Sequence, residues 1–495
     1  MSITIHKKHY VLLTFIITFI YSIPFLLSPY DFVDDMYRAS NGDLFVWFLN
    51  VRPFSVWLIR LLNGSAIVSD PYPFSFIIAF LALYLIYLYT TDKIIRSENY
   101  LLKLTIFIFL LCNPFFLQNL SYKYDCIIMT CSVALACLFV FKENNQNVCI
   151  DYIIRSCLIF SLYCFYQCAL TLVIGLLAVK LLNDSDQVAF SRLFRELFLR
   201  LCNILTTFLI YKICVVNFLI TNDYGPLGKI IVLNEHIFIH LIENIKIYLL
   251  LFLLYIQENY IIVSLIILSV FFLYTVIKDF LKKNYKRIYV LYLCFPLLLV
   301  ALTSSNIILN IPSGNTREMM GISAFFIFIF LYVQKAGCPS KIMLLVPICY
   351  LWTSLLLSSA LCNLKRIDHQ KNALIVQEIL QSIYHFGNKK VEGITIIRDD
   401  LRFSSQQTIM KTHPLTRKIF DFVGLSNPWY VNGLLNGEYY MHKNVIGRAS
   451  PDFPKDAKDI FSGCYIQSTL YGVILYVKTG SYCDSITKNY NPGTF

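Results

Sequence analysis

Residues 102–141 read LKLTIFIFLLCNPFFLQNLSYKYDCIIMTCSVALACLFVF. Two apolar runs, 102–119 and 126–141, flank a short polar turn, and each is close to the length that a helix needs to cross the roughly 30 Å hydrocarbon core of a bilayer. Similar runs recur on both sides of this stretch, at 10–28, 73–91, 201–220, 260–277, 288–304, 319–334 and 342–360. The pattern predicts a polytopic α-helical membrane protein.

A longer apolar run, residues 152–182, has the polar pair Tyr166 and Gln167 at its middle. It is too long for one ordinary span, so it predicts two short helices that meet at a break and brings the total to about eleven spans. The shorter run 244–256 is expected to lie in or on the outer interface. The composition agrees with a membrane protein, because 57% of the 495 residues are hydrophobic and only 15% are charged.

Two alternating sets of loops differ in charge. One set holds 18 Lys and Arg against 8 Asp and Glu, and the other holds 7 against 11. The basic set comprises 1–9, 92–103, 142–155, 180–200, 278–287 and 335–341, and the acidic set comprises 30–72, 121–125, 221–259 and 305–318. The positive-inside rule makes the basic set cytoplasmic, which places the N-terminus inside and the C-terminus outside. The net charge of +12 thus encodes topology, and we expect no nucleic-acid partner.

After Leu361 the hydropathy falls. Residues 363–386 predict an amphipathic helix stopped by Gly387, residues 391–397 a short strand, and residues 464–478 a β-hairpin. We therefore expect a transmembrane domain, 1–360, followed by a small outer α+β domain, 361–495. Cys464 and Cys483 lie in a polar stretch of that domain, where they either form a disulfide in an oxidising compartment or remain free thiols.

The first outer loop, 30–72, is dense in charged and aromatic residues. Residues 29–53 read PYDFVDDMYRASNGDLFVWFLNVRP. In a helix over 33–39, Arg38 stands four residues after Asp34 and three after Asp35, so the cation can orient an acid. A carboxylate held in this way can serve as a general base. The plainer interpretation is a solvated capping cluster.

Other polar residues mark further outer turns and spans. Arg52 can pair with a lipid phosphate or merely reach the headgroups. Asp125, at the end of the turn NPFFLQNLSYKYD (113–125), can complement a helix dipole, and Tyr166 and Gln167 can hydrogen-bond between helices. Lys212 lies within a predicted span, where it is either functional or reaches the interface.

Three motifs in order resemble a known family. DFVDDMYRASNG (31–42) with Trp47 and Arg52-Pro53, then NPFFLQNLSYKYD, then SLYCFYQ (161–167), are similar to the O-antigen conversion glucosyltransferases, the serotype-converting integral-membrane enzymes of enteric bacteria and their prophages. The resemblance covers roughly the first 180 residues. One departure is Val51, where this family pattern leads us to expect glycine before the arginine.

The resemblance implies a GT-C type enzyme of the bacterial inner membrane, with its C-terminal domain in the periplasm. It implies transfer of glucose from undecaprenyl phosphate glucose to a sugar of lipid-linked O-antigen, with a donor flippase and a donor-synthesising glucosyltransferase as functional partners. We expect no cofactor, and a divalent metal is not favoured because several outward cations are available. The C-terminal domain is expected to cover the first-loop acids and to help select the acceptor.

Roles for single residues follow from that reaction. Asp35, or its neighbour Asp34, is the expected base of an inverting displacement, and Arg38 holds it. The candidates for binding the donor phosphate are Arg52, Lys123, Lys212 and Arg317. The candidates for contacting a sugar are Trp47, Tyr122, Asp125, Tyr166 and Gln167; Trp47 and Tyr122 can equally be interfacial anchors.

Other function classes remain open at this stage. A transporter or flippase for a lipid-linked sugar predicts ionisable groups within several spans, whereas Lys212 stands almost alone. An O-antigen polymerase or ligase predicts a large arginine-rich outer loop between late spans, but the loop 305–318 has one arginine. A receptor or scaffold would leave the acidic first loop without a role.

Overall fold

The computed structural model describes residues 5–32, 35, 38–39, 42, 44–219, 237–310, 312, 314–337, 340–387, 391–399, 402–420, 444–445, 453 and 459–480. The chain divides into two compact units. The transmembrane unit comprises Met1–Leu27, Leu44–Ala66 and Pro71–Ser359, and the C-terminal unit comprises Ser28–Asp43, Ile67–Asp70 and Ala360–Phe495. Part of the first outer loop thus belongs to the same unit as the C-terminal region.

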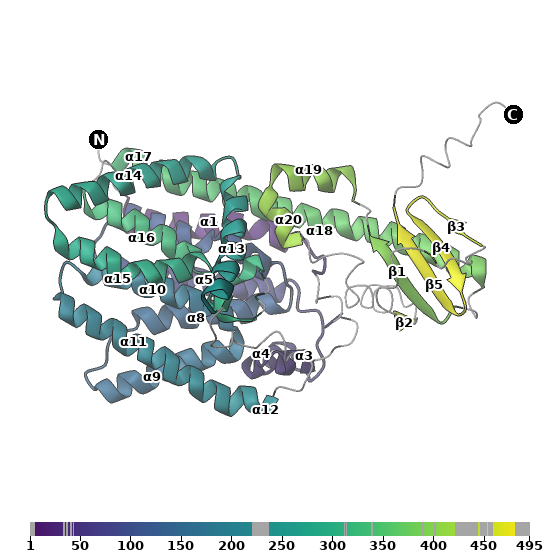
Figure 1. Ribbon diagram of the computed structural model, residues 1–495, viewed down its shortest axis with the longest axis horizontal. Helices are drawn as coiled ribbons and strands as arrows, with labels where there is room; N and C mark the ends of the chain where they lie inside the picture. Colours follow the sequence, from purple (N-terminus) through teal and green to yellow (C-terminus); the bar gives the residue numbers. More distant parts are fainter. Residues whose placement is uncertain are drawn as a thin grey trace. The chain divides into compact units, whose positions relative to one another are not determined.

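Each of the predicted spans is helical (Figure 1). Among the described residues, ten helices are long and apolar enough to cross a membrane, and α8 and α16 are shorter apolar helices. The helices over the predicted spans are α1 (Lys7–Leu26), α5 (Phe74–Ile94), α6 (Tyr100–Leu111), α8 (Asp125–Phe141), α9 (Val148–Phe165), α10 (Leu170–Asp184), α11 (Phe190–Tyr211), α14 (Ile261–Leu281), α15 (Tyr285–Leu302), α16 (Ile322–Lys335) and α18 (Leu345–Phe386). The chain is a polytopic membrane protein.

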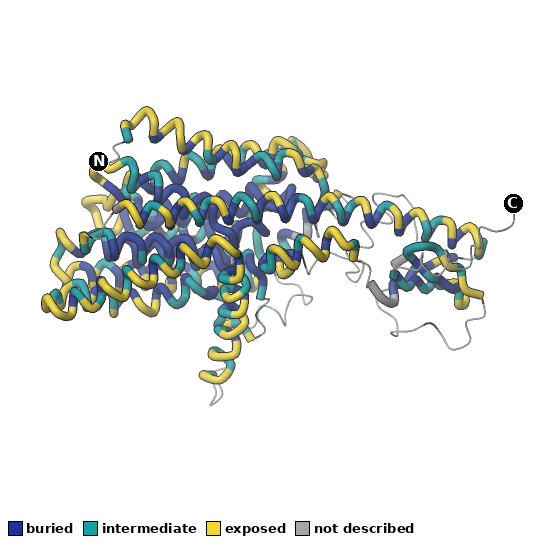
Figure 2. Tube along the Cα trace, turned by 90° about the horizontal axis from the view of Figure 1, so that it is seen from above, coloured by how far each residue is buried: buried dark blue, intermediate teal, exposed yellow. Residues whose placement is uncertain are grey.

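Buried residues concentrate inside the helical bundle, and exposed residues follow its outward faces (Figure 2). Many of the exposed residues are large and apolar, such as Phe15, Leu81 and Phe295, as expected where lipid rather than water is the solvent. Inside the bundle, α10, α15 and α16 approach closely at small residues. A Cβ built on Gly321 would lie 2.6 Å from the carbonyl oxygen of Thr171, so only glycine allows this contact.

The predicted break at Tyr166 is confirmed. Helix α9 ends at Phe165, Tyr166 is extended with φ −157°, and a 3-10 turn over Gln167–Ala169 leads into α10. The apolar run 152–182 therefore forms two helices, with Tyr166 and Gln167 between them.

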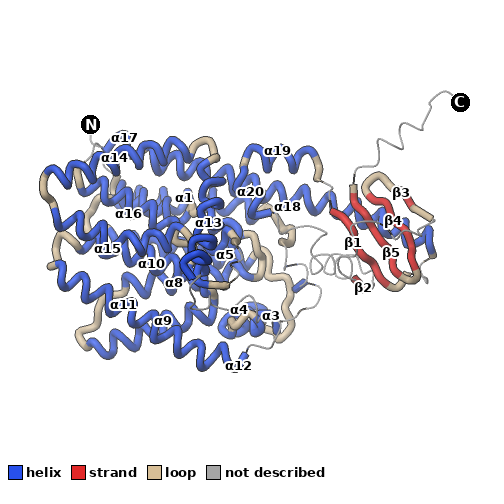
Figure 3. Tube along the Cα trace, in the orientation of Figure 1, coloured by secondary structure: helices blue, strands red, loops and turns tan. Residues whose placement is uncertain are grey.

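Helix α13 (Ile237–Ile256) contains the run 244–256 that we expected at the outer interface. It runs across the direction of α14 and α15 rather than alongside them (Figures 1 and 3). One face, Asn244, Tyr248, Leu251 and Tyr255, is buried, and the Asn244 side chain donates to the carbonyl oxygens of Ile307 and Leu309 at 2.8 Å each. Helix α13 has 20 residues, enough to cross a membrane. Its direction across α14 and α15 fits a helix at the interface better than a span.

Two features differ from the sequence predictions. The expected span 342–360 and the expected amphipathic helix 363–386 are one continuous helix, α18, of 42 residues; its sequence has no glycine, and its one proline, Pro347, lies in the first turn, where helices tolerate it. The first outer loop contains α3 (Phe45–Leu49) and α4 (Pro53–Asn63). Pro53 at the start of α4 and Gly64 after its end, with φ +60°, are the sequence signals of this helix.

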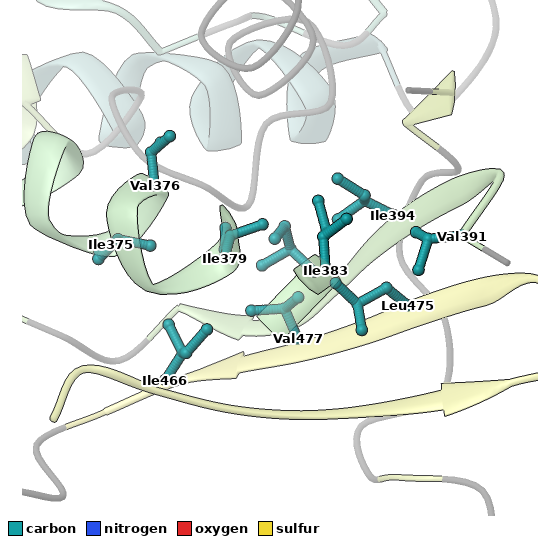
Figure 4. Packing of buried hydrophobic residues seen from close by; sticks show 10 residues of the cluster. Ile375, Val376, Ile379, Ile383, Val391, Ile394, Ile466, Leu475 and Val477 are labelled. Atoms are coloured by element: carbon teal, nitrogen blue, oxygen red, sulfur yellow. The ribbon is translucent and has the colours of Figure 1, made fainter. Parts of the chain in front are cut away.

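The described residues of the C-terminal unit form a five-stranded sheet in the order β2-β1-β5-β4-β3. The strands are β1 (Gly393–Asp399), β2 (Asn444–Val445), β3 (Phe461–Ser462), β4 (Ile466–Tyr471) and β5 (Ile474–Thr479). Strands β4 and β5 form the predicted hairpin, and β1 lies parallel to β5. Apolar residues of α18, including Ile375, Ile379 and Ile383, pack on the sheet (Figure 4), which gives this unit a core of its own. Helices α19 (Ser404–Thr412) and α20 (Pro414–Phe420) follow β1.

One carboxylate ties α18 to the start of β4. Glu378 accepts hydrogen bonds from the backbone N–H groups of Cys464 and Tyr465 at 2.8 Å each, and of Ile466 at 3.0 Å. Cys464 is disulfide-bonded, whereas the other cysteines in the described part of the chain are free. Cys483 lies outside the described residues.

Replacing Glu378 by alanine is expected to destabilise the C-terminal unit by about 3 kcal/mol. This is less than the sum of three hydrogen bonds to a charged acceptor, at about 1.5–3 kcal/mol each, because Glu378 is half-buried and water can partly replace its carboxylate. Hydrogen exchange of the β4 amides in the full-length protein measures the effect. Gln377→Ala, an exposed position one residue earlier, is the matched control. Equal exchange rates in the two variants would contradict the assigned role of Glu378.

Candidate active site

Arg52 lies in the transmembrane unit, beside the break between α9 and α10. It precedes Pro53 at the start of α4, and its guanidinium carbon is 4.7 Å from the centroid of the Tyr166 ring. Tyr166 is buried and Arg52 half-buried. No described carboxylate forms an ion pair with Arg52. The cation–π contact holds the guanidinium in place and leaves its charge available to an anion.

Arg317 makes a similar contact with a different tyrosine. Its guanidinium carbon is 5.6 Å from the centroid of the Tyr122 ring, and its Nη1 donates to the Tyr122 hydroxyl at 3.1 Å. Arg317 lies in the 3-10 turn Thr316–Glu318, just before α16. Arg52, Tyr122, Tyr166 and Arg317 are called the arginine–tyrosine cluster below.

Two amide side chains fix the loop that carries Arg317. The Oε1 atom of Gln118 accepts from the Thr316 hydroxyl at 2.7 Å and from the Arg317 backbone N–H at 3.0 Å. The Nδ2 atom of Asn119 donates to the Arg317 carbonyl oxygen at 3.2 Å. Neither residue was a sequence candidate, although both lie in the 113–125 motif and in a turn whose neighbours are apolar.

Tyr166 joins the two halves of the cluster. The turn Gln167–Ala169, which directly follows Tyr166, packs against the turn Thr316–Glu318, which carries Arg317 and Glu318. Glu318 is buried, and its carboxylate accepts a hydrogen bond from the Tyr248 hydroxyl of α13. Two arginines and one acid therefore surround the helix break, and the surplus positive charge suits a phosphate group.

The other two predicted phosphate ligands have different surroundings. Lys123 is buried, and its ammonium is 5.7 Å from the centroid of the Tyr72 ring, while its carbonyl oxygen accepts from the Ser75 hydroxyl at 2.8 Å. It follows Tyr122 directly in the chain. Lys212 is exposed on the surface just after the end of α11, as expected for a lysine that reaches towards headgroups.

The turn before Arg52 has an unusual backbone. Val51 has φ +58°, the left-handed region that favours glycine, and this is the position where the resemblance led us to expect glycine. Its carbonyl oxygen accepts from the Tyr211 hydroxyl at 2.8 Å and from Gln167 Nε2 at 3.5 Å. Gln167 also donates to Tyr211 at 2.8 Å. The predicted Tyr166–Gln167 pair thus supports the Arg52 turn from two sides.

Replacing Val51 by glycine is expected to stabilise the protein by up to about 1 kcal/mol, because a left-handed non-glycine residue costs about 1–2 kcal/mol and glycine costs about 0.5–1 kcal/mol in chain entropy. Thermal unfolding of the detergent-purified protein measures the change. Val51→Ala removes the branched side chain but keeps the strained φ, so it is expected to gain less. If Val51→Gly is less stable than Val51→Ala, the positive φ of Val51 does not strain the backbone.

Trp47 and Asp125 form a buried pair in the same unit. The indole Nε1 of Trp47 donates to Asp125 Oδ1 at 2.6 Å, and both side chains are almost fully buried. Asp125 is also the first residue of α8, where a negative charge complements the helix dipole. The pair links the first outer loop to the 113–125 motif, and its contact with a sugar stays a prediction.

The first-loop acid belongs to the C-terminal unit. Asp35 and Arg38 are both buried, and Asp35 Oδ1 lies 4.0 Å from Arg38 Nη1. The other oxygen, Oδ2, accepts from the backbone N–H of Phe32 at 3.1 Å. The predicted pair of Asp35 with Arg38, three residues later in the chain, is therefore present. Asp34 lies outside the described residues.

These arrangements offer two kinds of chemistry. The arginine–tyrosine cluster can bind an anionic phosphate, and the oriented Asp35 carboxylate can accept a proton. Within the described ranges, no group of three or more His, Cys, Asp or Glu side chains is placed to hold a metal ion.

Comparison with known proteins gives two matches. Residues 23–334 match the family model described as glucosyl transferase GtrII. The chain is also 25% identical over 452 residues to a Salmonella phage P22 protein described as an uncharacterized 55.3 kDa protein in the gtrB 5' region, which covers 89% of this chain and 90% of the phage protein. No solved structure matches. The family match includes both Asp35 and the whole arginine–tyrosine cluster.

Proposed function

Since this chain belongs to the GtrII family of glucosyl transferases, we propose that it moves glucose from undecaprenyl phosphate glucose to a sugar of lipid-linked O-antigen. The arginine–tyrosine cluster is the observation that carries the proposal. Its four residues come from four separate parts of the sequence, and they surround a break between two apolar helices. Such a site suits a donor that has a phosphate headgroup and a lipid tail.

The reaction is a single inverting displacement. The acceptor hydroxyl attacks C1 of glucose and its proton passes to Asp35, or to the neighbouring Asp34, while the bond between C1 and the phosphate oxygen breaks. Undecaprenyl phosphate leaves as a stable anion, so no strong general acid is required. Arg52 and Arg317, with Lys123, neutralise the charge that develops on the leaving phosphate.

The proposed location is the periplasmic face of a bacterial inner membrane. The charge asymmetry of the loops supports this orientation, and so does the disulfide at Cys464, because disulfides persist in oxidising compartments. In this scheme a flippase delivers the donor that another glucosyltransferase makes on the cytoplasmic side.

The test uses the purified full-length protein in liposomes with labelled undecaprenyl phosphate glucose and lipid-linked O-antigen. We expect label in the O-antigen glycan and a new glucose branch by linkage analysis. Labelled donor that crosses the bilayer without entering glycan would instead identify a flippase, and longer O-antigen chains without new glucose would identify a polymerase.

Chelation of divalent metals is expected to leave transfer unchanged within about twofold, because fixed cations of the chain stabilise the leaving phosphate in this proposal. Transfer is measured in excess EDTA and again after addition of Mg²⁺ or Mn²⁺. Loss of activity in EDTA with recovery on adding either metal would overturn the metal-independent mechanism.

A further inference from the structure

A short segment of the first loop, residues 30–32, is held by two helices of the C-terminal unit. The rings of Tyr30 and His369 are 4.9 Å apart, and the ammonium of Lys365 is 5.9 Å from the centroid of the Phe32 ring. The Phe32 ring is also 6.3 Å from that of Phe420, at the end of α20. Phe32 is fully buried and Lys365 and Phe420 nearly so.

The spacing of these contacts follows from backbone geometry. Lys365 and His369 are four residues apart on α18, a rise of about 6 Å. Tyr30 and Phe32 are two residues apart, and two residues of extended chain span about 6.6 Å. The segment can therefore place both rings on one face of α18 in register.

Phe32 also contacts the candidate base. Its backbone N–H donates to Asp35 Oδ2 at 3.1 Å, and its carbonyl oxygen accepts from the Asp35 N–H at 3.0 Å. The position of the Phe32 backbone therefore sets the position of one carboxylate oxygen. The ring contacts with Lys365 and Phe420 in turn fix Phe32.

We propose that Lys365 is a positioning residue that holds the Asp35 carboxylate through Phe32. The proposal rests on the proposed function, in which Asp35 or its neighbour is the base. The Phe32 ring lies against the buried ammonium of Lys365, and a cation–π contact is stronger where water is excluded. The C-terminal unit then contributes to catalysis itself, beyond any role in acceptor choice.

The experiment compares Lys365→Met, Lys365→Arg and Phe32→Leu in the liposome transfer assay. Lys365→Met and Phe32→Leu are expected to lower kcat by about 10- to 100-fold, because a displacement of about 1 Å in a catalytic group can cost 100-fold, while KM for the donor stays within about twofold. Lys365→Arg keeps the cation and is expected to restore most of kcat. Arg366→Met, an exposed position on the same helix, is the control for loss of a charge.

The decisive arm repeats the substitutions in an Asp35→Asn background. If Lys365 and Phe32 act through the carboxylate, neither change lowers the residual rate further. An additional loss of tenfold or more in that background, or an unchanged kcat in the single variants, would overturn the proposal. Where Phe32→Leu fails to give folded protein by gel filtration, Lys365→Met and Lys365→Arg decide alone.

These outcomes separate the inference from the proposed function. Absence of transfer by the wild-type protein, or full transfer by Asp35→Asn, contradicts the reaction or its base. An active wild type with an impaired Asp35→Asn variant, but with unaffected Lys365→Met and Phe32→Leu variants, contradicts only the positioning role.

Discussion

Replacing Asp35 by asparagine is expected to lower the rate of glucosyl transfer by about 100- to 10,000-fold, the usual contribution of a positioned general base. The substitution keeps the size of the side chain and the acceptor for the Phe32 N–H, but it removes the group that takes the proton. Donor binding is expected to persist, since the predicted phosphate ligands lie in the transmembrane unit. The liposome assay, with kcat and the donor KM measured separately, checks this.

Two neighbouring carboxylates supply the comparison. Asp31→Asn is the matched control, because Asp31 is half-buried in the same loop and has no assigned role. Asp34→Asn tests the adjacent acid of the predicted pair. Full transfer by Asp35→Asn would exclude this residue as the base, and loss confined to Asp34→Asn would assign the role to Asp34.

The second large effect concerns packing. Gly321→Ala is expected to prevent folding of the transmembrane unit or to lower its stability severely, because the added Cβ would lie 2.6 Å from the Thr171 carbonyl oxygen and 2.8 Å from both the Cα and the carbonyl oxygen of Ala301. All three atoms belong to the backbone of α10 or α15, so no side chain can rotate away. Fluorescence-detected gel filtration after heating measures the yield of folded protein.

A second glycine separates steric clash from chain flexibility. Gly472 has φ +63° and no atom within 4 Å of an added Cβ, so Gly472→Ala carries the conformational cost, about 1 kcal/mol, without a clash. We expect a small effect there. Equal loss of folded protein in both variants would show that the close approach at Gly321 does not decide the packing.

The large elements of the fold were predictable because hydrophobicity determines them locally. The apolar runs, the polar pair at Tyr166 and the alternating residues of the hairpin each lie within one stretch of sequence, and all three became the expected structure. The continuity of α18 does not follow from hydropathy, because the fall in hydropathy after Leu361 does not end the helix. Hydropathy reports the solvent around a helix, whereas glycine and proline determine where it stops.

The candidate site was predictable in composition but not in its contacts. The motifs identified Arg52, Tyr122, Tyr166 and Arg317 as separate candidates. Arg52 contacts Tyr166 and Arg317 contacts Tyr122. In each contact the two residues are more than 100 positions apart in the chain, so no local pattern encodes it. Gln118 and Asn119 were not candidates for the same reason, because the role of a buried amide can be assigned only when its hydrogen-bond partner is known.

Two successive stretches of α18 restrict how this protein can be recombined with its relatives. Lys365 and His369 contact the loop segment, while Ile375 to Ile383 pack on the sheet. Each inserted residue turns the rest of a helix by about 100°, so an insertion or deletion at 370–374 puts the two stretches out of phase unless it comes in steps of about seven. Functional chimaeras that exchange the sheet are therefore expected only where the junction conserves helical phase.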